Sequence, residues 1–163
     1  MAAVATIDGK REAQKQQIRE RLLAEALLLF SEQGLEHTKV SHIVEKSGIA
    51  RGTFYNYFPD INTLFDALIE QLNDRIHQQI LITRKETHNV YDYLYKTFKS
   101  YFDIIGTPEM VKFHIINQAQ IRQRSYQSTM VKTLVKDLNR DLKSSKKIKA
   151  FTEKYEFLLL SFM

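Results

Sequence analysis

Apolar residues recur at the spacing of an α-helix along most of the chain, and the first such stripe begins at Ile18. The stripe ends at Gly34, the usual residue for a left-handed helix end, where Leu35 is placed to pack back on the last turn. We therefore predict a first helix from about Lys15 to Gln33. Charged and glutamine-rich residues precede this helix and predict a flexible arm over residues 1–14.

Two short amphipathic segments follow, separated by Gly48, which permits a sharp turn. Thr38 can cap the first segment, and Pro59 stops the second because proline has no amide hydrogen to continue the ladder. Two short helices joined by a glycine-containing turn form the helix-turn-helix arrangement, whose second helix can enter a major groove of DNA. We assign Phe54 and Phe58 of the second segment to the core.

The next region is predicted to be helical as well. Asp60 can cap a long helix whose apolar stripe runs to Ile80. Residues 106–109 combine a glycine, a threonine cap, a first-turn proline and an acid, which marks the boundary between two further helices. We predict the second of these helices to continue over 111–124.

Two more apolar stripes, at 130–142 and 148–162, bring the expected number of helices to eight. The last stripe is still apolar where the sequence stops. We therefore expect this chain to lack a final helix, either through truncation or because it is naturally short, and we expect the exposed apolar face to need a partner.

Composition supports an all-α protein. The chain has 163 residues, of which 44% are hydrophobic and 26% charged, and this balance excludes general disorder. Five glycines and two prolines are too few for a turn-rich all-β chain. The absence of cysteine excludes a disulfide framework, a thiolate zinc site and a cysteine nucleophile. No apolar run approaches the roughly 18 residues that a membrane-spanning helix needs, and we expect a cytoplasmic protein.

The net charge does not by itself locate a nucleic-acid surface. It is +5 for the whole chain, which invites a nucleic-acid interpretation. Residues 1–72, however, hold 8 Lys and Arg against 10 Asp and Glu, a net charge of −2, whereas the remaining 16 and 9 give residues 73–163 a net charge of +7. The local arrangement of side chains must therefore identify any DNA-binding surface.

A resemblance to a known family rests on the turn and the second short helix, which form the sequence Gly-Ile-Ala-Arg-Gly-Thr-Phe-Tyr-Asn-Tyr-Phe over 48–58. Together with Leu-Phe-Ser-Glu-Gln-Gly at 29–34 and the stretch onward to Leu64, this segment resembles the DNA-binding head of the tetracycline-repressor (TetR) family of bacterial regulators. The resemblance implies a homodimer that binds a near-palindromic operator, an all-helical body, and release of DNA when a small molecule enters that body. Nothing after Leu72 is specific to the family.

Side-chain chemistry nominates three residues of the second short helix for contact with DNA. Arg51 opens this helix, and its guanidinium can pair with O6 and N7 of guanine or remain a solvated surface group. Gly52 has no side chain and lets the backbone approach DNA closely. Asn56 either contacts adenine or is solvated.

The resemblance implies further contacts. Thr53 and Tyr55 match family positions that hydrogen-bond phosphates, and Tyr57 matches a DNA-facing position with core packing as its alternative. Family members also place contacts early in the first short helix, at Lys39, Ser41 and His42. In the arm, the cations either reach phosphates or a minor groove or form a solvated tail; they are Lys10, Arg11, Lys15 and Arg19.

One position departs from the family pattern. Many members carry a lysine at the start of the fourth helix, where this chain has Ile61 preceded by Asp60. A phosphate anchor is therefore expected to be missing, which predicts modest non-specific affinity for DNA. His42 and Glu45 have a metal-compatible spacing but no third ligand, so we expect no metal site.

The body offers weaker signals. Twelve of the 18 Phe and Tyr residues follow Leu72, and an aromatic-lined effector pocket is one interpretation, with ordinary core packing as the other. Four residues flank the break at 106–108 and are the candidates for effector binding: Phe98, Phe102, Phe113 and His114. The lysine cluster at 143–149 either holds an anionic effector or keeps the surface solvated.

We predict an all-α protein in which residues 1–60 form the DNA-binding domain, with the helix-turn-helix at about 39–58, and 61–163 form a helical effector-binding and dimerisation domain. The expected function is a sequence-specific transcriptional regulator, a repressor released from its palindromic operator by an unknown small molecule. The alternative is a helical ligand-binding or dimerisation protein whose head is weakened for DNA. No P-loop, nucleophile elbow or metal triad is present, so we expect neither an enzyme nor a cofactor.

Overall fold

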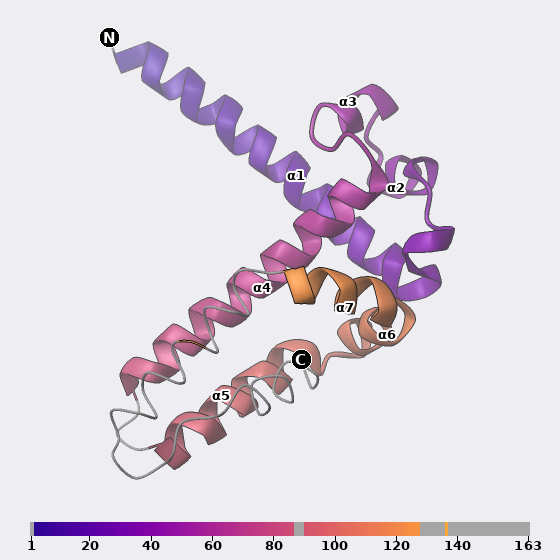
Figure 1. The fold of residues 1–163 in the computed structure, drawn as a ribbon. Helices are drawn as coiled ribbons and strands as arrows, with labels where there is room; N and C mark the ends of the chain where they lie inside the picture. The colour runs from indigo at the N-terminus through magenta and orange to yellow at the C-terminus, as the bar shows by residue number, and fades with distance from the viewer. Residues whose placement is uncertain (1, 87–89, 128–135, 137–163) are drawn as a thin grey trace. The chain divides into compact units, whose positions relative to one another are not determined.

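The computed structural model describes residues 2–86, 90–127 and 136, and the elements within these ranges are all α-helices (Figure 1). The all-α prediction is confirmed for this part of the chain. The helices are α1 (Ala2–His37), α2 (Val40–Ser47), α3 (Arg51–Tyr55), α4 (Ile61–Glu86), α5 (Val90–Ile105), α6 (Pro108–Ile116) and α7 (Gln118–Gln127). Apart from residue 136, the stripes expected at 130–142 and 148–162, the lysine cluster and the expectation of a missing final helix lie outside the described residues.

The chain divides into two compact units that are not contiguous in sequence. Met1–Glu70 and Pro108–Asn117 form one unit, which we call the head unit. Gln71–Thr107 and the chain from Gln118 onward form the second unit. The head unit therefore contains the residues 1–60 proposed as the DNA-binding domain together with the start of α4 and the whole of α6.

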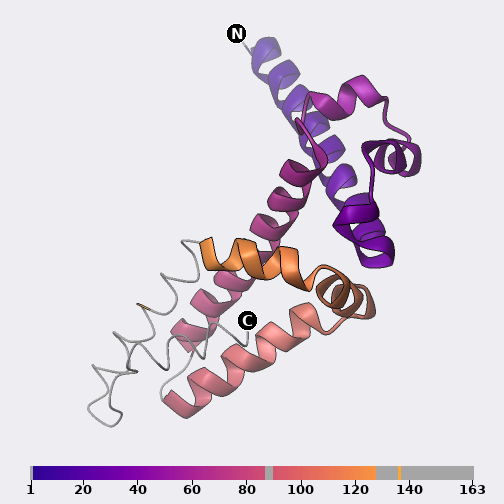
Figure 2. The ribbon, with the colours of Figure 1, turned by 45° about the vertical axis from the view of Figure 1, so that its right-hand side comes forward.

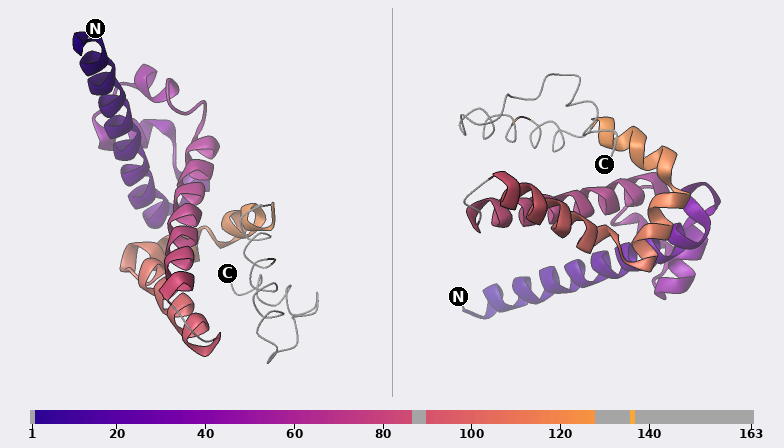
Figure 3. Two further views of the ribbon diagram at one scale, coloured as in Figure 1. Left: turned by 90° about the vertical axis from the view of Figure 1, so that its left-hand side faces the viewer. Right: turned by 90° about the horizontal axis from the view of Figure 1, so that it is seen from below.

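The core of the head unit centres on three phenylalanine rings. The ring centroids of Phe30 in α1 and Phe65 in α4 are 5.1 Å apart, and those of Phe65 and Phe113 in α6 are 5.6 Å apart. All three side chains are fully buried. Figures 2 and 3 show α6 lying beside the carboxy-terminal part of α1. The aromatic contacts explain why α6 belongs to the head unit despite its distance along the chain.

Gly34 interrupts α1, as its sequence position predicted. Its backbone has φ 78° and ψ 167°, which a side chain at this position would disfavour. An added Cβ would also lie 2.8 Å from Cγ2 of Ile116. Leu35 is buried next to the kink, as expected for a residue that packs back on the last turn.

The ends of α2 differ in how well they were predicted. Gly48 ends this helix in the left-handed conformation, with φ 64°, and so forms the expected sharp turn. Thr38, expected as the cap, does not occupy that position, which belongs to Lys39. The Thr38 hydroxyl instead donates to the carbonyl oxygen of Gly34 at 2.6 Å and closes the end of α1.

Residues 2–14 are helical in the structure, so the first helix begins earlier than the predicted start at about Lys15. They continue α1 toward the amino terminus, and from Gly9 to Gln17 every side chain position is exposed. Local pairing supports this exposed stretch, since Nζ of Lys15 lies 3.4 Å from Oε2 of Glu12, one turn away.

The second unit contains the end of α4 and all of α5 and α7. Ile76 and Ile80 of α4 are buried, as the predicted stripe required. The glycine–proline boundary is also confirmed, because α5 ends at Ile105 and α6 begins at Pro108. Among the described helices, none combines the length and apolar character needed to cross a membrane.

We predict that Gly34→Ala lowers the free energy of unfolding by about 1–3 kcal/mol, because the alanine must take a positive φ and displace Ile116. Urea unfolding followed by circular dichroism measures this loss. The matched control is Gly52→Ala, where an added Cβ meets no atom within 4 Å. Its stability should stay unchanged or rise slightly, since alanine favours a helix; equal losses in both variants would refute the explanation.

Candidate nucleic-acid interface

Helix α3 has one buried side and one exposed side. Phe54 is fully buried and Phe58, just beyond the helix, is 3% exposed, so the assignment of both to the core is confirmed. Their rings lie 6.1 Å apart. Arg51 and Tyr55 are exposed, and the Tyr55 ring contacts that of Phe54 edge to face, with the centroids 5.4 Å apart. The packing of Phe54 therefore turns the polar side chains of α3 outward.

Arg51 and Tyr55 interact with each other on this exposed side. Their side chains are one helical turn apart, and Nη2 of Arg51 donates to the Tyr55 hydroxyl at 3.5 Å. The guanidinium carbon also lies 5.9 Å from the centre of the tyrosine ring, within the range of a cation–π contact. The ring thus restrains an arginine that would otherwise be free to rotate in solvent.

The other residues nominated in α3 and the turn after it are also accessible. Gly52 is exposed, and the space that a side chain would fill there is open. Thr53 is half-buried, whereas Asn56 is exposed. Tyr57 is half-buried. This exposure fits neither of its two expected roles fully, which were a DNA-facing position and a core position.

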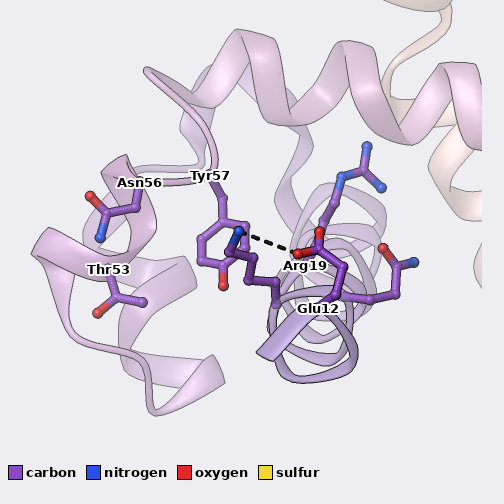
Figure 4. A pocket seen from close by; sticks show the side chains of 7 residues that line it. Glu12, Arg19, Thr53, Asn56 and Tyr57 are labelled. Carbon is purple, nitrogen blue, oxygen red and sulfur yellow. Dashed lines mark hydrogen bonds and ion pairs between the residues drawn. The ribbon is translucent and has the colours of Figure 1, made fainter. Parts of the chain in front are cut away.

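A polar cleft of about 460 Å³ separates α1 from α3 and the turn that follows. Figure 4 shows Tyr57, Thr53 and Asn56 on one side of this cleft and Glu12 and Arg19 on the other. Its lining consists of Glu12, Lys15, Gln16, Arg19, Thr53, Asn56 and Tyr57. The cleft brings two of the four predicted arm cations close to three of the DNA contacts predicted in α3 and the turn after it, which no spacing in the sequence indicated.

Arg19 is anchored at the cleft by an aromatic contact. Its guanidinium carbon lies 5.7 Å from the centre of the Phe58 ring, although Phe58 itself faces the core. Lys15 is paired with Glu12, and both side chains are well exposed. Lys10 and Arg11 lie further along the exposed stretch of α1, outside the cleft.

The amino terminus of α2 presents the remaining nominated residues. Lys39 and Ser41 are exposed, as a DNA-facing position requires. His42 is half-buried, and its Nδ1 accepts from the backbone N–H of Lys39 at 3.3 Å and from Nε2 of Gln33 at 3.0 Å. One ring nitrogen of His42 therefore stabilises the first turn of α2, a role that the sequence did not suggest.

Asp60 has the capping role predicted for it. Its Oδ1 accepts from the backbone N–H of Thr63 at 2.7 Å and from the Thr63 hydroxyl at 3.0 Å. These hydrogen bonds hold the pKa of the Asp60 carboxyl below its ordinary value. Asp60 is thus a negative charge at the start of α4, beside Ile61, where the family pattern has a lysine.

The residues proposed for effector binding are divided between the two units. Phe98 and Phe102 lie on α5 in the second unit and are 49% and 61% exposed. Phe113 is fully buried in the head unit against Phe65, so it is a core residue there and not part of an open pocket. His114 is half-buried, with Nδ1 2.8 Å from the carbonyl oxygen of Met110.

Part of the head unit is similar in sequence to a known protein family. Residues 22–68 match the family described as bacterial regulatory proteins, tetR family. This matched segment contains the helix-turn-helix, α2 and α3, and the resemblance to the TetR family lies there. Over 61 residues it is 43% identical to the uncharacterized HTH-type transcriptional regulator YvdT of Bacillus subtilis, a match that covers 37% of this chain and 31% of that protein. This likeness is therefore confined to a segment of 61 residues.

More distant similarity extends beyond the matched segment. The chain is 22% identical to IcaR of Staphylococcus aureus, the biofilm operon icaADBC HTH-type negative transcriptional regulator, over 90% of this chain and 80% of that protein. A crystal structure of a TetR-family regulator from Syntrophomonas wolfei has a TM-score of 0.70 at 18% identity and covers 90% of this chain and 79% of that one. The second comparison shows that the fold is shared. By contrast, the match to YvdT, at 43% identity, spans only about a third of that protein's length.

Among the described residues, no group of three or more His, Asp or Glu side chains is arranged to hold a metal ion. The spacing of His42 and Glu45 thus finds no third ligand there. The candidate interface presents cations, hydroxyls and amides, which are groups that bind phosphates and base edges, beside the exposed carboxylates of Glu12 and Asp60.

We predict that Asp60→Ala lowers the Tm at neutral pH, because the N–H of Thr63 then loses its acceptor. Since the folded-state pKa of Asp60 is lowered, its contribution is present above the ordinary value of 3.8 and is lost as the pH falls through the lowered pKa. Thermal melts from pH 7 into this acid range should show the two proteins converging. Asp60→Asn is the control: it retains an acceptor and should lack this pH dependence.

Proposed function

We propose that the protein is a sequence-specific DNA-binding transcriptional regulator that inserts α3 into a major groove. The observation that carries this proposal is the exposed Arg51–Tyr55 pair on α3, backed by the buried ring of Phe54. A guanidinium presented on an anchored helix can donate two hydrogen bonds to the O6 and N7 edge of guanine. The TetR-family match over 22–68 supports the same use of this helix.

In this proposal the flanking groups position the head on the sugar-phosphate backbone. Lys15 and Arg19 on α1 lie across the cleft from Thr53 and Asn56, so one DNA strand bordering the groove meets cations on one side and hydrogen-bonding groups on the other. Lys39 and Ser41 at the start of α2 supply further phosphate contacts, with the amino-terminal end of that helix favouring a negative charge.

The regulatory mode belongs to the same proposal. A homodimer would present two copies of α3 to successive major grooves, about 34 Å apart, and would favour a palindromic operator. Repression agrees with the role of the distant relative IcaR as a negative transcriptional regulator. Release by a small molecule bound in the helical body follows the pattern that the TetR resemblance implies, and Phe98 and Phe102 on α5 remain candidates for lining such a site.

We predict that Arg51→Ala weakens binding to the DNA upstream of the protein's own gene by about 5- to 150-fold, because each bidentate contact is worth roughly 1–3 kcal/mol of discrimination. Fluorescence anisotropy against this fragment and a scrambled fragment measures affinity and preference. The control is Lys112→Ala, which removes an exposed cation of the head unit outside α2 and α3. Equal effects of the two substitutions would argue against readout by Arg51.

A second prediction concerns the cleft. Lys15→Ala should weaken binding to all DNA sequences alike and reduce the slope of log K against log salt by about one, because one phosphate contact is lost. Glu12→Gln should strengthen binding, since it removes a negative charge from the same cleft and frees Lys15 from its partner. Titrations at several salt concentrations test both directions.

The outcome of these titrations also separates the two candidate functions. Residues 1–72 carry a net charge of −2, and Asp60 occupies the start of α4, which favours a head weakened for DNA. Saturable, sequence-dependent binding by the unsubstituted chain would support the regulator. Weak binding that does not distinguish the two fragments would instead support a helical ligand-binding or dimerisation protein.

A further inference from the structure

Asn117 is a fully buried amide at the point where the head unit ends. Its Nδ2 donates to the carbonyl oxygens of Phe30 and Phe113, each at 2.8 Å. Its Oδ1 accepts from the backbone N–H of Leu35 at 2.7 Å. Three hydrogen bonds thus engage a side chain that no solvent reaches, and two of its partners lie in α1, more than 80 residues earlier in the chain.

The kink in α1 explains why this amide is needed. Gly34 leaves helical geometry, so the carbonyls of the last turn and the N–H that follows the kink lack regular helical partners. The Asn117 amide supplies a donor to Phe30 on one side of the kink and an acceptor to Leu35 on the other. A buried backbone group without a partner costs about 1–3 kcal/mol, so an apolar residue here would leave these groups unsatisfied.

The hydrogen bonds continue from Asn117 toward the helix-turn-helix. Leu35, held by Asn117, accepts through its carbonyl from the backbone N–H of Thr38 at 3.2 Å. The Thr38 hydroxyl donates to Gly34 and accepts from Nε2 of Gln33 at 3.2 Å. Gln33 in turn donates to His42, so the network reaches the amino-terminal turn of α2.

His42 completes the connection to the candidate DNA surface. The same Nδ1 that accepts from Gln33 also accepts from the backbone N–H of Lys39, the residue that caps α2. Asn117 and Thr38 are 0% and 4% exposed and cannot touch DNA, whereas Lys39 is exposed. A buried network therefore ends at a residue that faces the proposed phosphate backbone.

We infer that Asn117 is a positioning residue for DNA binding: through Leu35, Thr38 and His42 it fixes the amino terminus of α2 relative to α1. This inference rests on the proposed function for its effect on affinity, but the network itself can be tested without DNA. It assigns to α6 a role in the geometry of the interface as well as in the core. Loss of the Asn117 side chain would let the start of α2 shift away from the orientation in which Lys39 and Ser41 meet phosphates.

The experiment compares Asn117→Ala with Phe113→Leu in the full chain. Both substitutions loosen α6, but Phe113 contributes a ring to the core through Phe65 and its side chain takes no part in the network. DNA affinity is measured well below the Tm of both variants, and amide hydrogen exchange is measured at Leu35 and Lys39. We expect Asn117→Ala to weaken DNA binding roughly tenfold and to speed exchange at both amides, and Phe113→Leu to change affinity less than about twofold.

Thr38→Val provides a second test that does not depend on the folding of the Asn117 variant. Valine has nearly the same shape but can neither donate to Gly34 nor accept from Gln33. It should weaken DNA binding as well, and the double variant should lose less affinity than the two single losses combined, because both act through one network.

Three results would overturn the inference. They are equal loss of affinity in Asn117→Ala and Phe113→Leu when the two lose the same Tm, unchanged exchange at Lys39 in Asn117→Ala, and additive effects of the Asn117 and Thr38 substitutions. If the unsubstituted chain shows no sequence-dependent binding, the proposed function fails by itself. In that case the exchange rates at Leu35 and Lys39 still decide whether Asn117 holds the start of α2.

Discussion

Phe65 contacts an aromatic ring on each side, Phe30 in α1 and Phe113 in α6, and the head unit depends on this stacking of three helices. Helices α2 and α3 contain only eight and five residues, which is too short for either to persist alone in water. They are stable because Ile43 and Phe54 are buried in the same unit. The proposed DNA-binding surface is thus an extension of the aromatic core, and its rigidity comes from buried side chains.

Features fixed by neighbouring residues were predictable from the sequence, whereas features fixed by distant residues were not. Gly34, Gly48 and the cap at Asp60 each carry a local signal, and the structure has a kink, a turn and a cap at those positions. The break at Asn117 was missed and a continuous helix over 111–124 was expected in its place, because the partners of this amide lie in α1. An asparagine in the sequence does not indicate that its side chain is buried, so the role of Asn117 is visible only in the packed structure.

The candidate interface divides in the same way. The exposure of Arg51 and Tyr55 follows from the burial of Phe54 and Phe58, and the four-residue spacing of Arg51 and Tyr55 already permitted their contact. The cleft was not predictable, because it forms only if the charged segment before Ile18 is helical and continues α1, and the composition of that segment did not indicate a helix. An amphipathic stripe is the usual sign of a helix, and this exposed segment has none.

The division of the head unit into two sequence segments has a consequence for recombination between relatives. A hybrid regulator that joins the first 70 residues of this chain to a foreign body would acquire a foreign counterpart of α6. The carboxy-terminal part of α1 would then face a helix that had not been selected with it. A hybrid that keeps the packing of the head unit would have to take both Met1–Glu70 and Pro108–Asn117 from the same parent, although the two segments lie apart in the sequence.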